Sequence, residues 1–260
     1  MRVAPHADWI VPDWPAPARV RALVTTRAGG ASAGPYASFN LGMRAGEDLA
    51  LVRRNRILLA ACLPGMPLWL NQVHGASVVA ADRVEAIGVE AEPETEPLAD
   101  AAVAHAAAKV CAVLTADCLP VLLCDRDGGA VAVAHAGWRG LASGVIGATV
   151  KAMARPPGRL MAWLGPAISQ DAYEVGPELR EAFLQCGTDG AADAAAFKPG
   201  KPGKFQADLY ALARNRLLSA GVQEVYGGGF CTFGESQRFY SYRRDGALSG
   251  RMSSLIWLEP

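Results

Sequence analysis

Short apolar runs recur along the chain, and turn-forming residues separate them. Many of the runs contain β-branched residues, which is typical of buried strands. We expect strands at 19–26, 68–73, 77–81, 110–115, 120–124, 130–134, 160–164, 224–230, 239–242 and 254–258.

Four longer segments place apolar residues at helical spacing instead. Proline and glycine mark their ends, with Pro177 at a first helical position and Gly221 after a last one. The expected helices are 47–62, 141–154, 177–185 and 208–220. Because helices do not follow every strand, a regular doubly wound sheet is not expected. An α+β arrangement of mixed sheets with helices packed outside fits the order of elements better.

Two softer stretches do not divide the chain. Residues 84–97 are rich in glutamate and predict an exposed loop, and 197–204 are rich in glycine and proline and predict a mobile turn. Neither separates two self-sufficient cores, so we expect one domain over residues 1–260.

Charge and cysteine usage exclude several classes of partner. Lysine plus arginine equals aspartate plus glutamate at 25 each, so neither a nucleic-acid binder nor a partner of anionic membranes is indicated. The N-terminus lacks the basic and apolar regions of a signal peptide, and the longest apolar region is interrupted. The six cysteines form no C-x-x-C pair, which favours reduced thiols and a cytoplasmic location.

Three residues carry most of the chemical information. His74 lies in N-Q-V-H-G, Cys118 in T-A-D-C-L-P and His135 in A-H-A-G-W-R-G, each at or after the end of an expected strand. Sites are commonly built at such ends. One thiolate and two imidazoles form a ligand set for a zinc-like metal with an open fourth position, which catalysis requires. Taken singly, each residue is better explained as structural; taken jointly, they favour a metal site or a Cys–His site.

Asp117, beside Cys118, has two explanations. It is either a site residue, as an acceptor that orients a ligand or as a general base, or a turn residue that binds a backbone N–H. We expect Trp138 to pack against its neighbours and Arg139 to lie exposed at the start of a helix.

Two further segments resemble site loops. Residues 25–30 and 39–42 combine strand ends with glycines, and 239–246 combine aromatic and basic side chains. Their arginines, with Arg251, offer paired donors for phosphate or carboxylate, and Tyr240 and Tyr242 offer flat faces for a ring. Our candidates for holding phosphate, ribose or another part of the substrate are Arg27, Asn40, Gln72 and Arg244.

These motifs together resemble the bacterial laccase-domain (YfiH-like) family, also described as polyphenol oxidases and as peptidoglycan editing factors. The shared motifs are T-T-R-A-G-G, F-N-L-G, N-Q-V-H-G, T-A-D-C-L-P-V-L-L, A-H-A-G-W-R-G, L-G-P-A-I-S, Y-E-V-G and F-Y-S-Y-R-R-D-G. The resemblance implies a four-layer α/β/β/α sandwich. It also implies a zinc-dependent purine nucleoside phosphorylase, with inorganic phosphate as co-substrate. Such enzymes cleave adenosine, inosine, guanosine and methylthioadenosine and deaminate adenosine.

Three other functions remain open. The first is a metal-free hydrolase or amidase that edits peptidoglycan precursors, with Cys118 as nucleophile and His135 or His74 as base. The second is a copper phenol oxidase, because His-Cys-His also suits a blue-copper centre. A multicopper cluster needs many histidines, however, and this chain has four in all, which leaves only His6 and His105. The third is a binding module with a structural metal.

Overall fold

The computed structural model describes residues 2–86, 88–186 and 190–260. In these residues the strands form three sheets. A four-stranded sheet has the order β1 (Val20–Val24), β13 (Met252–Leu258), β5 (Val110–Thr115) and β2 (Pro67–Leu68). A six-stranded sheet has the order β12 (Glu224–Gly227), β8 (Leu160–Leu164), β6 (Leu119–Asp125), β7 (Val131–Ala136), β4 (Ala101–Ala104) and β3 (Val78–Ala80). A small sheet has the order β10 (Phe197–Pro199), β11 (Phe205–Ala207) and β9 (Glu174–Val175).

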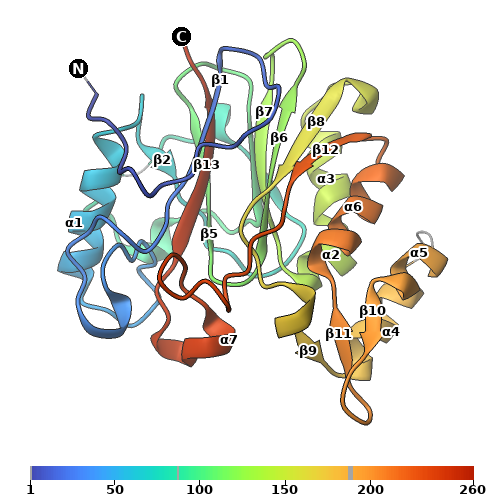
Figure 1. The fold of residues 1–260 in the computed structure, drawn as a ribbon. Helices are drawn as coiled ribbons and strands as arrows, with labels where there is room; N and C mark the ends of the chain where they lie inside the picture. Colours follow the sequence, from blue (N-terminus) through green and yellow to red (C-terminus); the bar gives the residue numbers. More distant parts are fainter. Residues whose placement is uncertain (1, 87, 187–189) are drawn as a thin grey trace.

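The two larger sheets stack on each other and helices cover their outer faces (Figure 1). Helix α1 (Leu49–Ala60) covers the four-stranded sheet. Helices α2 (Trp138–Ala142), α3 (Val145–Ala152) and α6 (Leu209–Ser219) cover the six-stranded sheet. Both sheets are mixed, with β2–β5, β3–β4 and β8–β12 parallel and their other pairs antiparallel. The predicted α+β class and four-layer sandwich are confirmed.

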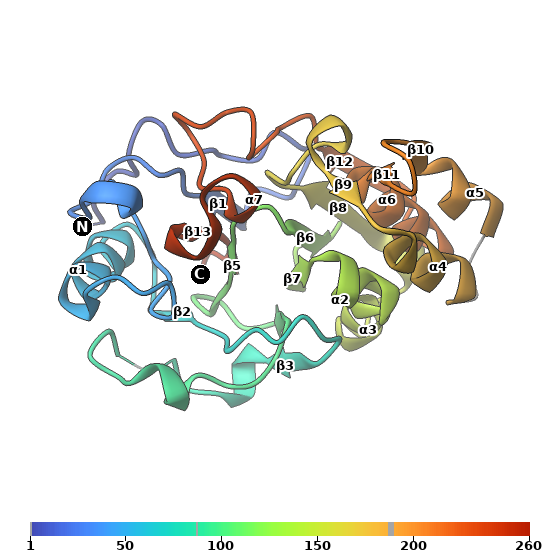
Figure 2. The same ribbon diagram turned by 90° about the horizontal axis from the view of Figure 1, so that it is seen from below.

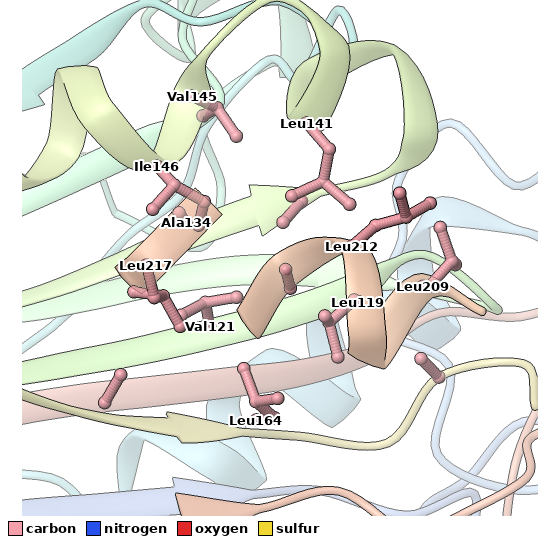
Figure 3. Packing of buried hydrophobic residues seen from close by; sticks show 14 of the residues in the cluster. Leu119, Val121, Ala134, Leu141, Val145, Ile146, Leu164, Leu209, Leu212 and Leu217 are labelled. Atoms are coloured by element: carbon pink, nitrogen blue, oxygen red, sulfur yellow. The ribbon is translucent and has the colours of Figure 1, made fainter. Parts of the chain in front are cut away.

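Three apolar layers hold the sandwich together, and β6 shows how the sequence feeds two of them. Leu119 and Val121 pack toward α2, α3 and α6, whereas Leu122 and Cys124 pack between the sheets. Successive residues of a strand point to opposite faces, so a strand buried on both faces reads as one continuous apolar run. Figure 3 shows Leu119 and Val121 meeting Leu212 and its neighbours on the helices.

Smaller elements complete one side and one end of the sandwich. Helices α4 (Pro177–Gln185) and α5 (Gly190–Ala195) lie beside the small sheet. Helix α7 (Tyr242–Asp245) lies near the ends of β13 and β5 (Figure 2). Short 3-10 turns occupy Gly34–Tyr36, Ala81–Arg83, Pro93–Thr95, Pro157–Arg159, Gln170–Ala172 and Gly246–Leu248.

Several expected elements differ from those observed. The helix expected at 141–154 is two helices, because the chain turns at Gly144 with φ +86°. The strand expected at 68–73 is reduced to β2, and no strand forms at 239–242, where Ser241 instead caps α7. Strand β4 was not predicted, because its alanine-rich sequence has little intrinsic strand preference and burial decides its structure.

Of the two expected loops, one is found as a turn and one needs correction. The turn at 197–204 lies in the hairpin that joins β10 to β11. The acidic stretch 84–97 is not exposed throughout, because Glu96 is 4% exposed and pairs with Arg56 and Arg44.

Candidate metal centre and arginine-lined cavity

The three residues of the expected ligand set meet at one edge of the two large sheets. His74 lies in the loop after β2, Cys118 in the turn between β5 and β6, and His135 near the end of β7. One ligand atom from each lies within 4.8 Å of the others. The histidine rings are 4.7 Å apart at an angle of 72°. His135 is buried and His74 is exposed, so the group reaches from the interior to the surface.

Sharp backbone bends bring two of these residues to the site. His74 has φ +60° and Asp117, which precedes Cys118, has φ +86°. These values fall in the left-handed region, which side chains other than glycine rarely adopt. Such positions cluster where the surrounding structure holds a functional group in place.

Asp100 fixes the orientation of both histidine segments, and the sequence motifs did not reveal it. Its buried carboxylate lies 2.9 Å from His135 Nδ1 and accepts hydrogen bonds from the backbone N–H groups of His74 (2.8 Å), Gly75 (2.7 Å) and Val73 (3.3 Å). A proton on His135 Nδ1 is donated to Asp100, which leaves Nε2 as the ligand atom. The only signal in the sequence is a lone aspartate before an alanine-rich run.

The electrostatics of the group favour ionised forms when no metal is bound. Burial alone would raise the pKa of the Cys118 thiol, but the charge of His135 and hydrogen bonds from both imidazoles outweigh it and lower the pKa to about 6. Burial likewise opposes the charged form of His135, yet the Cys118 thiolate and the Asp100 carboxylate raise its pKa to about 9. A thiolate is the form of cysteine that binds metals and acts as a nucleophile.

Gly137 leaves room for this group. A Cβ added there would lie 2.8 Å from Cys118 Sγ and 3.4 Å from His74 Cδ2. The backbone that opens α2 therefore touches the ligands directly, and a side chain at this position would occupy their space.

Asp117 anchors the Cys118 turn to the C-terminal part of the chain. Its Oδ1 accepts a hydrogen bond from Thr232 Oγ1 (2.6 Å), and its Oδ2 accepts from Ser241 Oγ (3.0 Å) and the backbone N–H of Arg243 (2.6 Å). The carboxylate lines the cavity but is held by three protein donors. This geometry gives Asp117 a positioning role at the turn.

A cavity of about 550 Å³ opens beside the three ligands, all of which line it. Its aromatic lining residues are Trp138, Tyr173 and Tyr242, and its arginines are Arg44, Arg56, Arg139, Arg243 and Arg251. Flat apolar faces and guanidinium groups in one cavity suit a ligand with an aromatic ring and an anionic group.

Of the four candidate substrate residues, only Gln72 lines this cavity. Its side-chain amide exchanges two hydrogen bonds with the backbone of Leu114, at 2.8 and 2.7 Å. Asn40 is fully buried, and its side chain bonds Glu47 and the backbone N–H of Arg251. Asn40 therefore orders the loop behind the cavity wall.

Arg27 and Arg244 also lie outside the cavity lining. Arg27 donates to the carbonyls of Ala37 (2.9 Å) and Ser236 (2.8 Å). Arg244 donates to the carbonyls of Thr232 and Phe239, each at 3.0 Å, and pairs with Asp245. Their guanidinium groups are occupied by the protein's own acceptors, so they hold loops together.

Two of the arginines that line the cavity show what the sequence indicated about them. Arg139 is exposed at the start of α2, as expected, and it also lines the cavity and lies over the Trp138 ring at 4.7 Å. Arg56 occupies an apolar register position of α1, where a charged residue is unusual. A charged residue at this position was the feature of the sequence that could have indicated a special role for Arg56.

The donor set fits a metal ion. A buried imidazole oriented by a carboxylate, a thiolate and a second imidazole converge beside a backbone that leaves no side chain between them. The protein therefore belongs to a class of α+β proteins in which two stacked mixed sheets carry a His-Cys-His metal-binding group at one edge. A family model described as multi-copper polyphenol oxidoreductase laccase matches residues 21–259, and the chain belongs to this family.

Relatives extend over nearly the whole chain, which confirms the resemblance found in the motifs. A purine nucleoside phosphorylase of Pseudomonas aeruginosa is 50% identical over 252 residues, covering 96% of this chain and 98% of the relative. The purine nucleoside phosphorylase YfiH of Escherichia coli is 48% identical over 251 residues, with the same coverage.

Solved structures agree with the fold. A Neisseria meningitidis protein superposes with a TM-score of 0.89 at 51% identity, covering 97% of this chain and all of that one. YlmD of Geobacillus stearothermophilus gives a TM-score of 0.88 at 30% identity, covering 97% of this chain and 96% of that one. Across 2–86, 88–186 and 190–260, none of the helices has both the length and the hydropathy that a membrane span needs.

Proposed function

We propose that this protein is a zinc-dependent purine nucleoside phosphorylase that acts in the cytoplasm. Its substrates are adenosine, inosine, guanosine and methylthioadenosine, with inorganic phosphate, and it also deaminates adenosine. The observation that supports this most is the shared cavity, in which the His-Cys-His group, aromatic rings and arginines meet. The names of the Pseudomonas aeruginosa and Escherichia coli relatives support the same activity.

Zinc is the metal that these donors favour. It accepts both thiolate and imidazole ligands, and three protein ligands leave a fourth position open. When bound, it would supply Lewis-acid chemistry for the deamination of adenosine. His135 keeps its proton on Nδ1 toward Asp100, and Cys118 is already disposed to ionise.

The protein's own side chains suit the phosphorolysis step. A phosphate oxygen attacks C1′ of the ribose while the bond from C1′ to the purine breaks. The bonding electrons leave with the base, which takes up a proton. Positive charge develops on the ribose. The arginines must therefore hold the phosphate in line with the breaking bond without removing the nucleophilicity of its attacking oxygen. Tyr173 and Tyr242 offer faces for the purine ring.

A metal-free Cys–His hydrolase is the second candidate, because Cys118 is paired with His135 and its pKa is lowered to about 6. A copper phenol oxidase receives less support from the geometry. His105 bonds Asp82 and the Met153 carbonyl, and His6 lies near Asp8, so neither lines the cavity. The cavity therefore offers two of the four histidines, too few for a multicopper cluster.

Metal analysis and a nucleoside panel test the proposal together. Protein purified without chelator should contain about one zinc per chain. It should release base from adenosine, inosine, guanosine and methylthioadenosine only with phosphate, and form ribose 1-phosphate. Adenosine should in addition yield inosine and ammonia. Free ribose formed equally well without phosphate would indicate hydrolysis instead.

A matched pair of cysteine variants separates the metal enzyme from the Cys–His hydrolase. Cys118→Ser should lose zinc and turnover, whereas Cys62→Ser, a free thiol away from the cavity, should keep both. Turnover that persists in chelator-treated, zinc-free wild type and disappears in Cys118→Ser would favour the hydrolase.

A further inference from the structure

Three of the cavity's arginines are tied to one segment, residues 40–44. Arg44 belongs to it. Arg56 Nε donates to the carbonyl of Leu41 (3.0 Å), and the N–H of Leu41 donates to the carbonyl of Arg251 (3.1 Å). The N–H of Arg251 donates to Asn40 Oδ1 (2.8 Å). Residues distant in sequence are thus fixed side by side on one wall of the cavity.

Arg56 is held rigidly and yet is incompletely bonded. It is 3% exposed, its Nη1 pairs with Glu96 Oε1 (2.9 Å), and its guanidinium carbon lies 4.2 Å from the centre of the Trp69 ring. Among the described residues its buried Nη2 has no hydrogen-bond partner. A buried donor without an acceptor is unfavourable, so an acceptor that reaches it from the cavity is stabilised.

The same wall carries an excess of positive charge. Glu96 is the carboxylate partner of both Arg44 (2.6 Å) and Arg56. The side chain of Arg251 donates to the carbonyls of Ser249 (2.6 Å) and Gly250 (3.0 Å), and no carboxylate in the described residues forms an ion pair with it. Two guanidinium groups of this wall therefore share one carboxylate, and the third has no ion-pair partner among the described residues. Positive charge at this wall favours an anion that enters the cavity.

We propose that Arg44, Arg56 and Arg251 form the subsite that binds inorganic phosphate. The assignment rests on the proposed phosphorylase function and adds the residues that take its co-substrate. Guanidinium groups bind tetrahedral oxyanions through paired donors, and a rigid Arg56 loses little side-chain freedom on binding. Asn40 is a positioning residue here, because it orders the segment that carries the arginines.

Kinetics with the zinc-loaded enzyme test the subsite by varying phosphate and inosine separately. In Arg251→Gln and Arg44→Gln, we expect KM for phosphate to rise about tenfold or more, because each removes charge-assisted hydrogen bonds. KM for inosine should stay within about twofold. Arg53→Gln is the matched control, because Arg53 lies on α1 like Arg56 but pairs with Glu92 outside the cavity.

Calorimetric titration of inorganic phosphate into the zinc-loaded protein gives a readout that needs no turnover. The wild type and Arg53→Gln should bind phosphate, sulfate should compete, and Arg251→Gln should bind at least about tenfold more weakly. Arg56→Lys, which keeps the buried charge but not the planar donors, should also weaken binding.

The outcomes distinguish this subsite from the proposed function. Phosphate binding that depends on Arg251, in a protein that cleaves no nucleoside, would refute the phosphorylase and leave the subsite standing. No phosphate binding by the wild type, or equal affinity in Arg251→Gln and Arg44→Gln, would overturn the subsite. A rise in KM for inosine alone would overturn it too, because the arginines would then serve the nucleoside.

Discussion

Replacing Asp100 with asparagine tests how the protein orients its metal ligands. Oδ1 serves His135 Nδ1 and the N–H of His74, and Oδ2 serves the N–H groups of Gly75 and Val73. In Asp100→Asn one oxygen becomes an NH₂ group. Whichever way the amide turns, that group faces two donors and two hydrogen bonds are lost.

The expected cost follows from these contacts. Hydrogen bonds to a charged acceptor contribute about 1.5–3 kcal/mol each, so the metal-free variant should lose about 3 kcal/mol or more of its free energy of unfolding. That is less than the stability of most domains, which is about 5–15 kcal/mol. Because carboxylates that orient a metal-bound histidine typically contribute 10–100-fold in affinity, zinc affinity should fall by about that factor.

Asp82→Asn is the control for this experiment. Asp82 also accepts from a histidine ring, at 3.2 Å from His105 Nδ1, and from backbone N–H groups, including that of Ala106 (3.0 Å), but it lies outside the cavity. Zinc affinity is measured by competition with a chromophoric chelator, and unfolding by denaturant with and without zinc. If Asp100→Asn and Asp82→Asn bind zinc equally well, Asp100 does not orient the ligands.

The pH dependence of the same comparison has a defined sign. Burial opposes ionisation of Asp100, but the hydrogen bonds from His135 and the backbone lower its pKa below the ordinary value of 3.8. Its contribution to stability is therefore complete above that value and is lost as the pH falls through the lower folded pKa. The stability difference between wild type and Asp100→Asn should narrow below about pH 3.8.

Three further changes have expected outcomes. In Gly137→Ala, the new Cβ would crowd Cys118 Sγ at 2.8 Å, so zinc affinity should fall while circular dichroism stays native; unaltered affinity would contradict the close approach. Apparent zinc affinity should rise with pH from about 6 to about 9, because the metal displaces the His135 proton throughout this range and the Cys118 proton only at its lower end; a titration without slope would refute the thiolate–imidazolium pair. Asp117→Asn should keep most of its zinc but lower thermal stability and slow turnover, because an amide cannot accept from both Ser241 and the neighbouring donors; unchanged melting temperature and turnover would show that the anchor is dispensable.

The His-Cys-His group could be predicted from the sequence because each of its residues lies in a distinct local motif at a strand end. Asp100 could not be predicted in this way, because its role depends on β4, and the alanines of β4 form a strand only because the neighbouring strands bury them. The divided helix at Gly144 is a similar case, since an isolated glycine within an apolar pattern is compatible with a continuous helix.

The arginines that line the cavity were harder to predict for a different reason. Arginines near glycines look equally available in a sequence, but availability depends on which carbonyls lie nearby in space. Arg27 and Arg244 donate to acceptors of the protein outside the cavity, whereas Arg251 and the buried Arg56 line the cavity. Which acceptors lie near a given arginine depends on the folded structure and cannot be predicted from the local sequence.

The position of Cys118 has a mechanical consequence. The chain crosses from the four-stranded sheet to the six-stranded sheet in the turn that carries it, while His74 follows a strand of the first sheet and His135 belongs to the second. An ion bound by all three would link the two sheets at this edge, so metal loading should raise the free energy needed to separate them there.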